Sequence, residues 1–269
     1  MKFLAVNVKP RRWTAIVLSI LPFLLCIILY NTTAHVRHQE NPKDKLVPTA
    51  SQLVEGVQRV ALEPDRKGDL RLWVDTMASA RRFLIGVSLM FIGVLLGLYM
   101  GILPYVEQLL YRFVLFFDKT PALALLPILF IVFGLGEVSK IALIAIGVMP
   151  TIVLDTYLKA KEVPREQIIK AMTLKASNAE ILYRIVLPKI FPKVLDTIRL
   201  NFKAIILFLI AGEALAATAG LGYRIFLVRR YIAMDIIIPY VIWISLLVFI
   251  VDWLVRIWIA KRYTWLGKD

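Results

Sequence analysis

The sequence of 269 residues holds a single cysteine, Cys26, and only two histidines. One cysteine cannot close an internal disulfide, and it argues against a cysteine-based metal cluster. His35 and His38 are spaced like ligands, but Glu40 offers the only further oxygen nearby, so we interpret both as surface histidines. We therefore expect neither a disulfide nor a metal site in this chain.

Charged residues are absent from five long stretches, and 59% of all residues are hydrophobic, against about 45–50% in a soluble domain. A helix that crosses about 30 Å of hydrocarbon needs ~20 mostly apolar residues. Two of the stretches reach that length alone, and the others reach it once flanking Lys and Arg side chains extend to the interface. The pattern predicts an all-α polytopic membrane protein. The charge-free stretches are Trp13–Val36, Phe83–Val106, Thr120–Gly136, Ile141–Leu154 and Ile236–Val251.

Six membrane spans are predicted from these stretches and from the Pro and Gly residues between them. The third span is interrupted at Asp118–Pro121, and a short amphipathic helix lies between Pro48 and Pro64, after the first span. Residues 1–72 thus form an N-terminal span with an amphipathic segment, and residues 73–269 hold the other spans. The predicted spans are Thr14–Tyr30, Leu72–Gly101, Pro104–Phe133, Ser139–Leu158, Val194–Ala214 and Ile236–Trp258.

The net charge of +14 is concentrated in three stretches, Lys2–Arg12, Lys159–Lys203 and Arg256–Lys268. Segments rich in Lys and Arg stay on the cytoplasmic side of a membrane, so we interpret this charge as a topology signal and not as a nucleic-acid surface. Six spans then place both termini in the cytoplasm, and the first span is retained as a helix rather than cleaved as a signal peptide. The connector 31–72 also carries seven Lys or Arg residues, so the orientation depends mainly on the segment 159–193.

The segment between the fourth and fifth spans is predicted to form two short helices that meet at a corner. Pro164 and Glu166 are typical of a helix start. Ser177 and Glu180 match the capping box of a second helix, which continues to Pro188. Two amphipathic helices at a corner on the cytoplasmic face form a shape suited to docking into a groove of a partner protein.

The run Ala171–Ser177, followed by Ile185–Pro188, resembles the EAA loop of binding-protein-dependent ABC importer permeases, whose pattern is E-A-A-x3-G-x9-I-x-L-P. The chain matches at Ala171, Ile185, Leu187 and Pro188, and departs at Ile169, Lys170 and Lys175. In that family the loop inserts into the ATPase subunit. The resemblance therefore implies a coupling loop, residues 160–190, in which the ATPase-coupling residues are Ala171, Leu174, Lys175, Ala176, Ser177, Glu180, Leu187 and Pro188.

Four further segments, in the same order as in that family, resemble the nitrate/sulfonate/taurine group of these permeases. The most specific is Phe133–Lys140, FGLGEVSK, which is close to the group's FGIGETSK. The others are Val47–Gln52, Thr120–Pro127 and Gly212–Tyr223, so the resemblance covers about Val47 to Trp258. It implies the type I ABC importer permease fold and a place in the bacterial inner membrane.

The resemblance also implies partners and a function. A second copy or a sister permease would complete a pore for a small, anionic solute, which a periplasmic or lipid-anchored solute-binding protein delivers. Separate ATPase subunits would bind ATP and Mg, so this chain would need no cofactor and no catalytic residue. They would drive alternating access through differential affinity for two states. Two alternatives stay open: a non-transporting membrane scaffold with a degenerate coupling loop, and an ion-driven secondary transporter, for which we find neither inverted repeats nor an ion relay.

Four polar residues are candidates for the translocation pathway. Asp118, Lys119 and Thr120 interrupt the third span, and a broken helix at membrane depth is tolerated where it lines a cavity. Glu213 lies near the outer end of the fifth span. The alternative for Asp118 and Lys119 is a structural ion pair, either with each other or with Asp155.

Lys175 stands where the family has a glycine between the two coupling helices. Glycine adopts positive φ without strain, whereas a lysine with positive φ lowers the stability of the fold by about 1 kcal/mol. The departure therefore predicts either an altered turn or a different surface on the ATPase, for which we hypothesise a more acidic groove.

Overall fold

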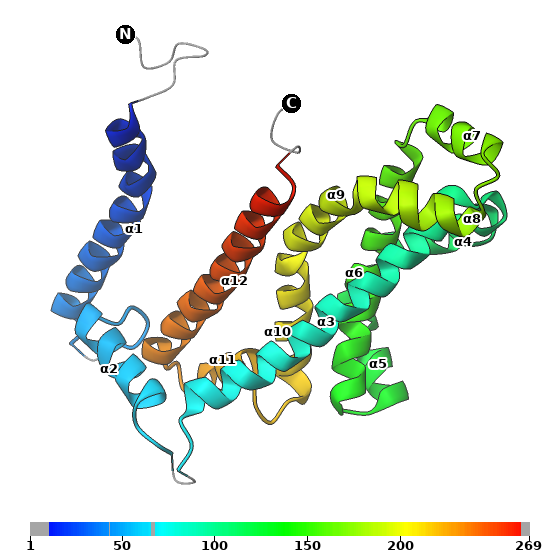
Figure 1. Ribbon diagram of the computed structural model, residues 1–269. Coiled ribbons are helices and arrows are strands. Elements are labelled where there is room, and N and C mark those ends of the chain that lie inside the picture. Colours follow the sequence, from blue (N-terminus) through cyan, green and yellow to red (C-terminus); the bar gives the residue numbers. More distant parts are fainter. Residues whose placement is uncertain (1–10, 43, 66–67, 265–269) are drawn as a thin grey trace.

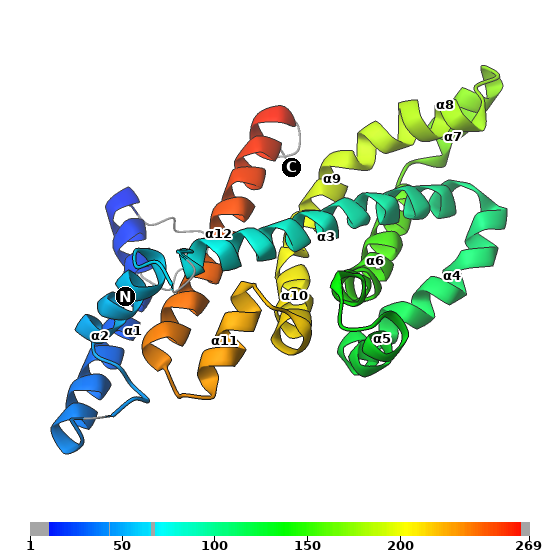
Figure 2. The same cartoon turned by 90° about the horizontal axis from the view of Figure 1, so that it is seen from below.

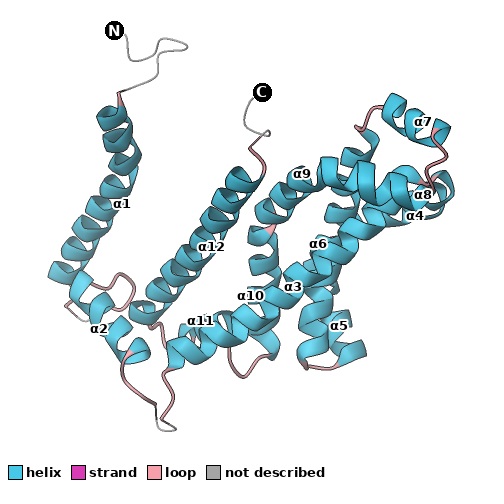
Figure 3. Cartoon of the chain, in the orientation of Figure 1, coloured by secondary structure: helices cyan, strands magenta, loops and turns pink. Residues whose placement is uncertain are grey.

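In the computed structural model of the chain, the structure describes residues 11–42, 44–65 and 68–264, and all regular elements there are helical (Figure 3). Parts of the two predicted basic ends lie outside the described residues, among them Lys2, Lys9 and Lys268. The elements are α1 (Arg12–Glu40), α2 (Ala50–Ala61), α3 (Arg71–Ile102), α4 (Pro104–Lys119), η1 (Ala122–Leu125), α5 (Leu126–Phe133), α6 (Glu137–Lys161), α7 (Arg165–Thr173), α8 (Asn178–Glu180), η2 (Ile181–Val186), α9 (Leu187–Leu200), α10 (Phe202–Ala216), α11 (Leu221–Arg229) and α12 (Met234–Arg262).

Four helices, α1, α3, α6 and α12, are each long and apolar enough to cross a membrane, and two bent helix pairs raise the number of candidate spans to six. One pair joins α4 to Ala122–Phe133 at 85°, which confirms the predicted interruption of the third span at Asp118–Pro121. The other pair joins Asn178–Ala216 to α11 at 53°. The helix that holds the predicted fifth span therefore begins well before Val194, because α9 continues without a break from the second coupling helix.

The amphipathic helix α2 connects the first span to the rest of the chain (Figures 1 and 2). Thr49 caps it through a complete capping box, in which the Thr49 amide donates to Gln52 Oε1 at 2.9 Å. Apolar residues of α2 pack against α12. In contrast, α1 stands apart from α12, and no residue in the most apolar 18-residue stretch of α1 is buried. The chain thus forms one packed body, α2 to α12, with α1 beside it.

The core of that body is the contact between α3 and α6, the most extensive helix pair among the described residues. Glycines at positions 93, 97 and 101 form a stripe without side chains on α3, and this stripe packs against α6. A Cβ on Gly97 would lie 2.8 Å from the Thr156 Cβ, and one on Gly101 would lie 2.5 Å from the Ala160 Cβ. Small residues at this spacing let membrane helices approach closely, so the stripe sets the separation of α3 and α6.

Replacing Gly97 with alanine is expected to destabilise the protein by about 1–3 kcal/mol, because the added methyl group forces the backbones of α3 and α6 apart. Thermal unfolding of the purified protein in detergent measures the effect. Gly136→Ala is the matched control, since no atom lies within 4 Å of a Cβ placed there and the backbone φ is −79°. Equal unfolding temperatures for the two variants would show that the stripe does not fix the helix separation.

Candidate functional site

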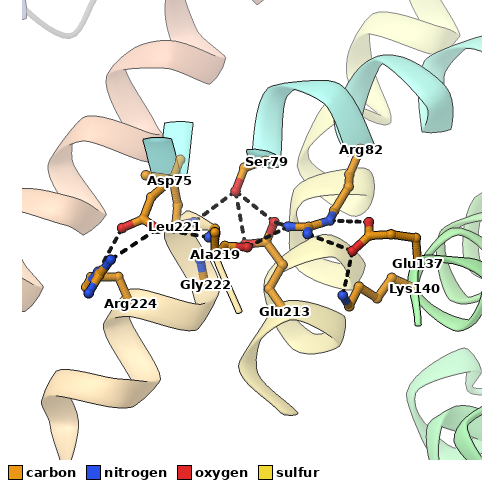
Figure 4. A network of polar contacts seen from close by, with 11 residues as sticks. Asp75, Ser79, Arg82, Glu137, Lys140, Glu213, Ala219, Leu221, Gly222 and Arg224 are labelled. Carbon is orange, nitrogen blue, oxygen red and sulfur yellow. Dashed lines mark hydrogen bonds and ion pairs between the residues drawn. The ribbon is translucent and has the colours of Figure 1, made fainter. Parts of the chain in front are cut away.

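Two sequence motifs that are far apart in the chain meet in one polar cluster. The segment 133–140 supplies Glu137 and Lys140 at the start of α6, and the segment 212–223 supplies Glu213 at the end of α10. Arg82 of α3 joins them, as Figure 4 shows. We call this set the charge network; its members are Asp75, Ser79, Arg82, Glu137, Lys140, Glu213 and Arg224.

Arg82 lies at the centre of the charge network. Its Nε and Nη2 donate to the two carboxylate oxygens of Glu137 at 2.7 and 2.8 Å, and its Nη1 donates to Glu213 Oε1 at 2.6 Å. Lys140 Nζ donates to the same Glu137 at 2.7 Å. Arg82, Lys140 and Glu213 are buried, whereas the Glu137 side chain is 54% exposed. Two buried cations therefore hold one carboxylate that is open to the surroundings.

Glu213 has no exposed surface and accepts hydrogen bonds from three directions. Besides Arg82, the Ser79 hydroxyl donates to it at 2.8 Å and the Gly222 amide of α11 donates at 2.8 Å. A Cβ on Gly220, where φ is +143°, would lie 2.5 Å from this carboxylate. The glycine is thus required twice, for its backbone angle and for the close approach of Glu213.

Asp75 extends the charge network to α11 and α12. It accepts from Arg224 Nε at 2.8 Å, from the Gly220 amide at 3.0 Å and from the Tyr240 hydroxyl at 3.1 Å. Carboxylates beside the free amides at a helix N-terminus are stabilised by those donors and by the helix dipole. The described network contains three cations and three carboxylates, so it is neutral as a whole, and it ties α3, α6, α10, α11 and α12 together.

Sequence reasoning identified Glu213 but missed the partners that surround it. Asp75, Ser79 and Arg82 recur at intervals of four and three residues, which places them on one face of an otherwise apolar helix. Polar residues on one face of a membrane helix usually face protein or a water-filled cavity. That spacing could have predicted that this face of α3 is buried in the protein. It does not indicate which residues on other spans contact it.

The other predicted pathway residues lie at the end of α4 and share no contact with the charge network within the described residues. Lys119 Nζ donates to Asp118 Oδ2 at 2.9 Å, and the Thr151 hydroxyl donates to Asp118 Oδ1 at 2.8 Å. The Thr120 hydroxyl donates to the Phe116 carbonyl. Asp118 and Lys119 thus pair with each other. The alternative prediction, an ion pair with Asp155, was wrong, because Asp155 pairs with Lys159 on the next turn of α6.

The coupling loop has the predicted corner, formed by α7, α8 and the turn between them. The capping box is confirmed, with the Glu180 amide donating to Ser177 Oγ and the Ser177 amide donating to the Glu180 carboxylate. The latter hydrogen bond lowers the pKa of Glu180 below its ordinary value. A carboxyl with a lowered folded-state pKa stabilises the fold at neutral pH, and this contribution is lost only as the pH falls through that lowered value.

Lys175 adopts the left-handed backbone conformation that glycine favours, with φ of +59°. The Lys175 amide donates to the Met172 carbonyl and the Ala176 amide donates to the Ala171 carbonyl, the two hydrogen bonds of a Schellman motif. The turn is therefore unaltered, and the first of the two sequence-based explanations for this lysine is wrong.

The coupling loop presents several of its predicted residues to the surroundings. Leu174 at the corner is 83% exposed, and Lys175, Ser177 and Pro188 are also exposed. Ala171 is buried, and Ala176, Glu180 and Leu187 are half-buried. The segment that follows, η2, is a π-helix whose Tyr183 hydroxyl lies 2.6 Å from that of Tyr99 on α3. In Figure 1 the corner lies at the same end of the molecule as the first turn of α1 and the last turn of α12.

Comparisons with known proteins agree with this architecture. Residues 91–263 match the family described as "Binding-protein-dependent transport system inner membrane component". The taurine transport system permease protein TauC of Escherichia coli is 28% identical over 223 residues, 82% of this chain and 81% of that protein. A putative ABC transporter permease protein of Methanocaldococcus jannaschii is 31% identical over 222 residues, 81% of this chain and 83% of that protein.

A solved structure and a third relative extend the comparison. A chain of the MetNI methionine ABC transporter has the same fold, with a TM-score of 0.60 at 16% identity over 79% of this chain and 96% of that chain. The putative aliphatic sulfonates transport permease protein SsuC of Bacillus subtilis is 26% identical over 220 residues, 82% of this chain and 78% of that protein. The resemblance drawn from the motifs and the predicted type I fold are both confirmed. The chain therefore belongs to the binding-protein-dependent transport system inner membrane components, the non-catalytic, membrane-spanning permease subunits of ABC importers, whose ATPase is a separate subunit.

Proposed function

We propose that this chain forms, with a second copy or a sister permease, the translocation pore for a small anionic solute in the bacterial inner membrane. ATPase subunits dock on the coupling loop and drive alternating access, and a periplasmic or lipid-anchored solute-binding protein delivers the solute. Both termini lie in the cytoplasm. The relatives named for taurine and for aliphatic sulfonates support an anionic solute.

The observation that carries the proposal is the coupling loop. Its corner has a complete Schellman motif and a complete capping box, so the two helices are held rigidly relative to each other, which supports a docking role. Leu174 protrudes from it as an uncovered apolar side chain, and Ile169 and Met172 of α7 are exposed as well; exposed apolar side chains gathered in one place mark interaction surfaces. A degenerate loop on a scaffold protein has no need of this order.

Affinity purification of the tagged complex from native membranes tests the docking step. We expect an ATPase subunit to be recovered in one-to-one ratio with this chain, and to be lost when residues 171–188 are replaced by a flexible linker. Recovery of the chain without any ATPase would overturn the proposal.

Transport itself separates the proposal from its two alternatives. Proteoliposomes that contain the purified complex and the solute-binding protein should take up an alkanesulfonate only when ATP is supplied. Uptake that follows a proton or sodium gradient without ATP would support the secondary transporter. A complex that hydrolyses ATP but moves no solute would support the scaffold.

Lys175 provides a test of the proposed acidic groove on the ATPase. Lys175→Gly is expected to stabilise the corner by about 1 kcal/mol, since glycine has no strain at positive φ. Lys175→Ala keeps the strain and removes only the charge, so it isolates the electrostatic effect. We expect both variants to weaken ATPase association and only the glycine variant to raise the unfolding temperature. Normal association of Lys175→Ala would show that the groove is not acidic.

The pathway roles of Asp118, Lys119, Thr120 and Glu213 stay predictions. Lys119 is the most accessible cation of this set, because its side chain is 75% exposed, and an anionic solute would compete with Asp118 for it. Glu213 has no exposed surface, so we assign it a supporting role through the charge network.

A further inference from the structure

One carboxylate of the charge network differs from the other two in its exposure. The side chain of Glu137 is 54% exposed, whereas Asp75 and Glu213 have no exposed surface. The two cations that bind Glu137 are buried, with Arg82 7% and Lys140 3% exposed. Their side chains reach Glu137 from two helices, α3 and α6 (Figure 4). Two buried cations thus share an anion that the surroundings can reach.

Lys140 depends on this carboxylate more than Arg82 does. Arg82 Nη1 also donates to Glu213 at 2.6 Å and to the Ala219 carbonyl at 2.9 Å. Lys140 Nζ donates only to Glu137 among the described contacts. A buried cation without a partner is strongly destabilising. Whenever Glu137 turns away, another anion therefore has to take its place.

Glu137 is placed so that it can turn away while the buried cations stay where they are. It is the first residue of α6, and its side chain is half in the surroundings. Exposed side chains change rotamer readily. No atom lies within 4 Å of a Cβ placed on Gly134 or Gly136, so the turn that precedes Glu137 is open on its outer side. Rotation of this one side chain would uncover Arg82 and Lys140.

The charge that Glu137 would leave behind matches one monovalent anion. Without its carboxylate, the network has three cations and two carboxylates. A sulfonate group has one negative charge and three acceptor oxygens, so it can accept from the Arg82 guanidinium and the Lys140 ammonium as Glu137 does. A solute without an anionic group would leave Lys140 unpaired. The exposed cations would therefore select a monovalent oxoanion.

The position of Glu137 agrees with a role where the solute enters. The helix α6 runs from Glu137 to Lys161, and its 25 residues span roughly 38 Å at 1.5 Å per residue. The coupling loop follows the other end of that helix. Glu137 thus lies on the side of the membrane opposite the ATPase, where the solute-binding protein delivers the solute in the proposed function.

We propose that Arg82 and Lys140 form an entry subsite for the transported anion, and that Glu137 occupies this subsite as a tethered competitor until the solute displaces it. In the resting state Glu137 neutralises the two buried cations. When the solute arrives, its anionic group takes over the same hydrogen bonds and Glu137 rotates outward. The inference rests on the proposed function, because it requires an anionic solute.

Equilibrium binding of ethanesulfonate to the detergent-purified complex tests the subsite, because this measurement needs neither ATP nor the solute-binding protein. Glu137→Gln removes the competing charge and keeps the shape of the side chain. If the rotated state of Glu137 is populated to about 10% or less, the variant binds ethanesulfonate at least about tenfold more tightly than the wild type. Ethanesulfonamide, which is neutral, should show no such gain.

Two control variants make the gain specific. Glu107→Gln removes a carboxylate that pairs with Lys161 at 2.6 Å near the other end of α6, and should bind ethanesulfonate as the wild type does. The double variant Glu137→Gln with Lys140→Gln has a neutral network with one cation fewer, so the gain should disappear. Ethanesulfonate should also raise the unfolding temperature of Glu137→Gln more than that of the wild type, since a ligand stabilises the state that binds it.

Several results would overturn the subsite. One is equal ethanesulfonate affinity in the wild type and in Glu137→Gln; if the wild-type complex still takes up an alkanesulfonate with ATP, the proposed function stands without this site. Another is a Glu137→Gln complex that is unstable and that ethanesulfonate does not stabilise. A third is increased retention of phosphatidylglycerol by Glu137→Gln without ethanesulfonate binding, which would assign the two cations to a lipid headgroup.

Discussion

Replacing Glu213 with glutamine is expected to remove most folded protein from the membrane. The glutamine has the same shape but no charge, so the buried Arg82 guanidinium loses the carboxylate 2.6 Å from its Nη1 and keeps only the half-exposed Glu137, which Lys140 shares. Removing one partner of a buried ion pair costs up to about 3–5 kcal/mol, out of a total stability of about 5–15 kcal/mol, and the charge network is left with one more cation than carboxylates. The yield of monodisperse protein and its unfolding temperature measure the loss.

Two further variants make this result specific. Glu162→Gln removes a carboxylate that is 60% exposed and paired only with Lys193 among the described contacts, and exposed pairs contribute about 0–1 kcal/mol, so its yield should equal that of the wild type. The double variant Glu213→Gln with Arg82→Gln should be more stable than Glu213→Gln alone, because the charge network is neutral again and Glu137 keeps Lys140. Additive losses in the double variant would contradict a direct ion pair.

The features that sequence reasoning predicted correctly are local ones. The charge-free stretches located the spans because a helix in hydrocarbon satisfies its own backbone, so length and apolarity suffice. Pro121 located the break after α4, since proline cannot continue a helix there. The capping box at Ser177 could be predicted from the sequence because all of its atoms belong to four consecutive residues.

The charge network could not be assembled in the same way. Arg82 and Glu213 are 131 residues apart, and Asp75 and Arg224 are 149 apart, so their pairing depends on how the spans pack. Sequence motifs identified Glu137 and Glu213 separately, but nothing in either motif names the arginine between them. The packing that brings them together depends on glycine contacts between α3 and α6, which are tertiary as well.

Lys175 shows how a tertiary context overrides a local preference. Its positive φ is unfavourable for a lysine, yet two backbone hydrogen bonds of the Schellman motif and the capping box of the next helix fix the corner from both sides. The strain of one residue is smaller than the cost of losing those contacts. A departure from a family pattern at a glycine therefore does not by itself change the turn.

Replacing Leu174 with aspartate is expected to abolish ATP-driven uptake while the permease remains folded. Leu174 is 83% exposed at the corner of the coupling loop, so the substitution buries no charge in the free subunit. In the complex, burying a leucine side chain contributes about 2 kcal/mol, and its loss weakens ATPase association by roughly 30-fold. Pull-down of the ATPase and uptake into proteoliposomes measure the two effects separately.

The control for this prediction is Leu62→Asp, which makes the same change at a residue that is 71% exposed and ends α2. In Figure 1, α2 lies at the opposite end of the molecule from the corner of the coupling loop. Because Leu62 lies far from the coupling loop, this variant should retain the ATPase at the wild-type level. If Leu174→Asp also retained the ATPase, the corner would not be the docking surface. Since the folded corner is held by backbone hydrogen bonds that neither substitution touches, any loss of association in Leu174→Asp alone reports the interface and not the fold.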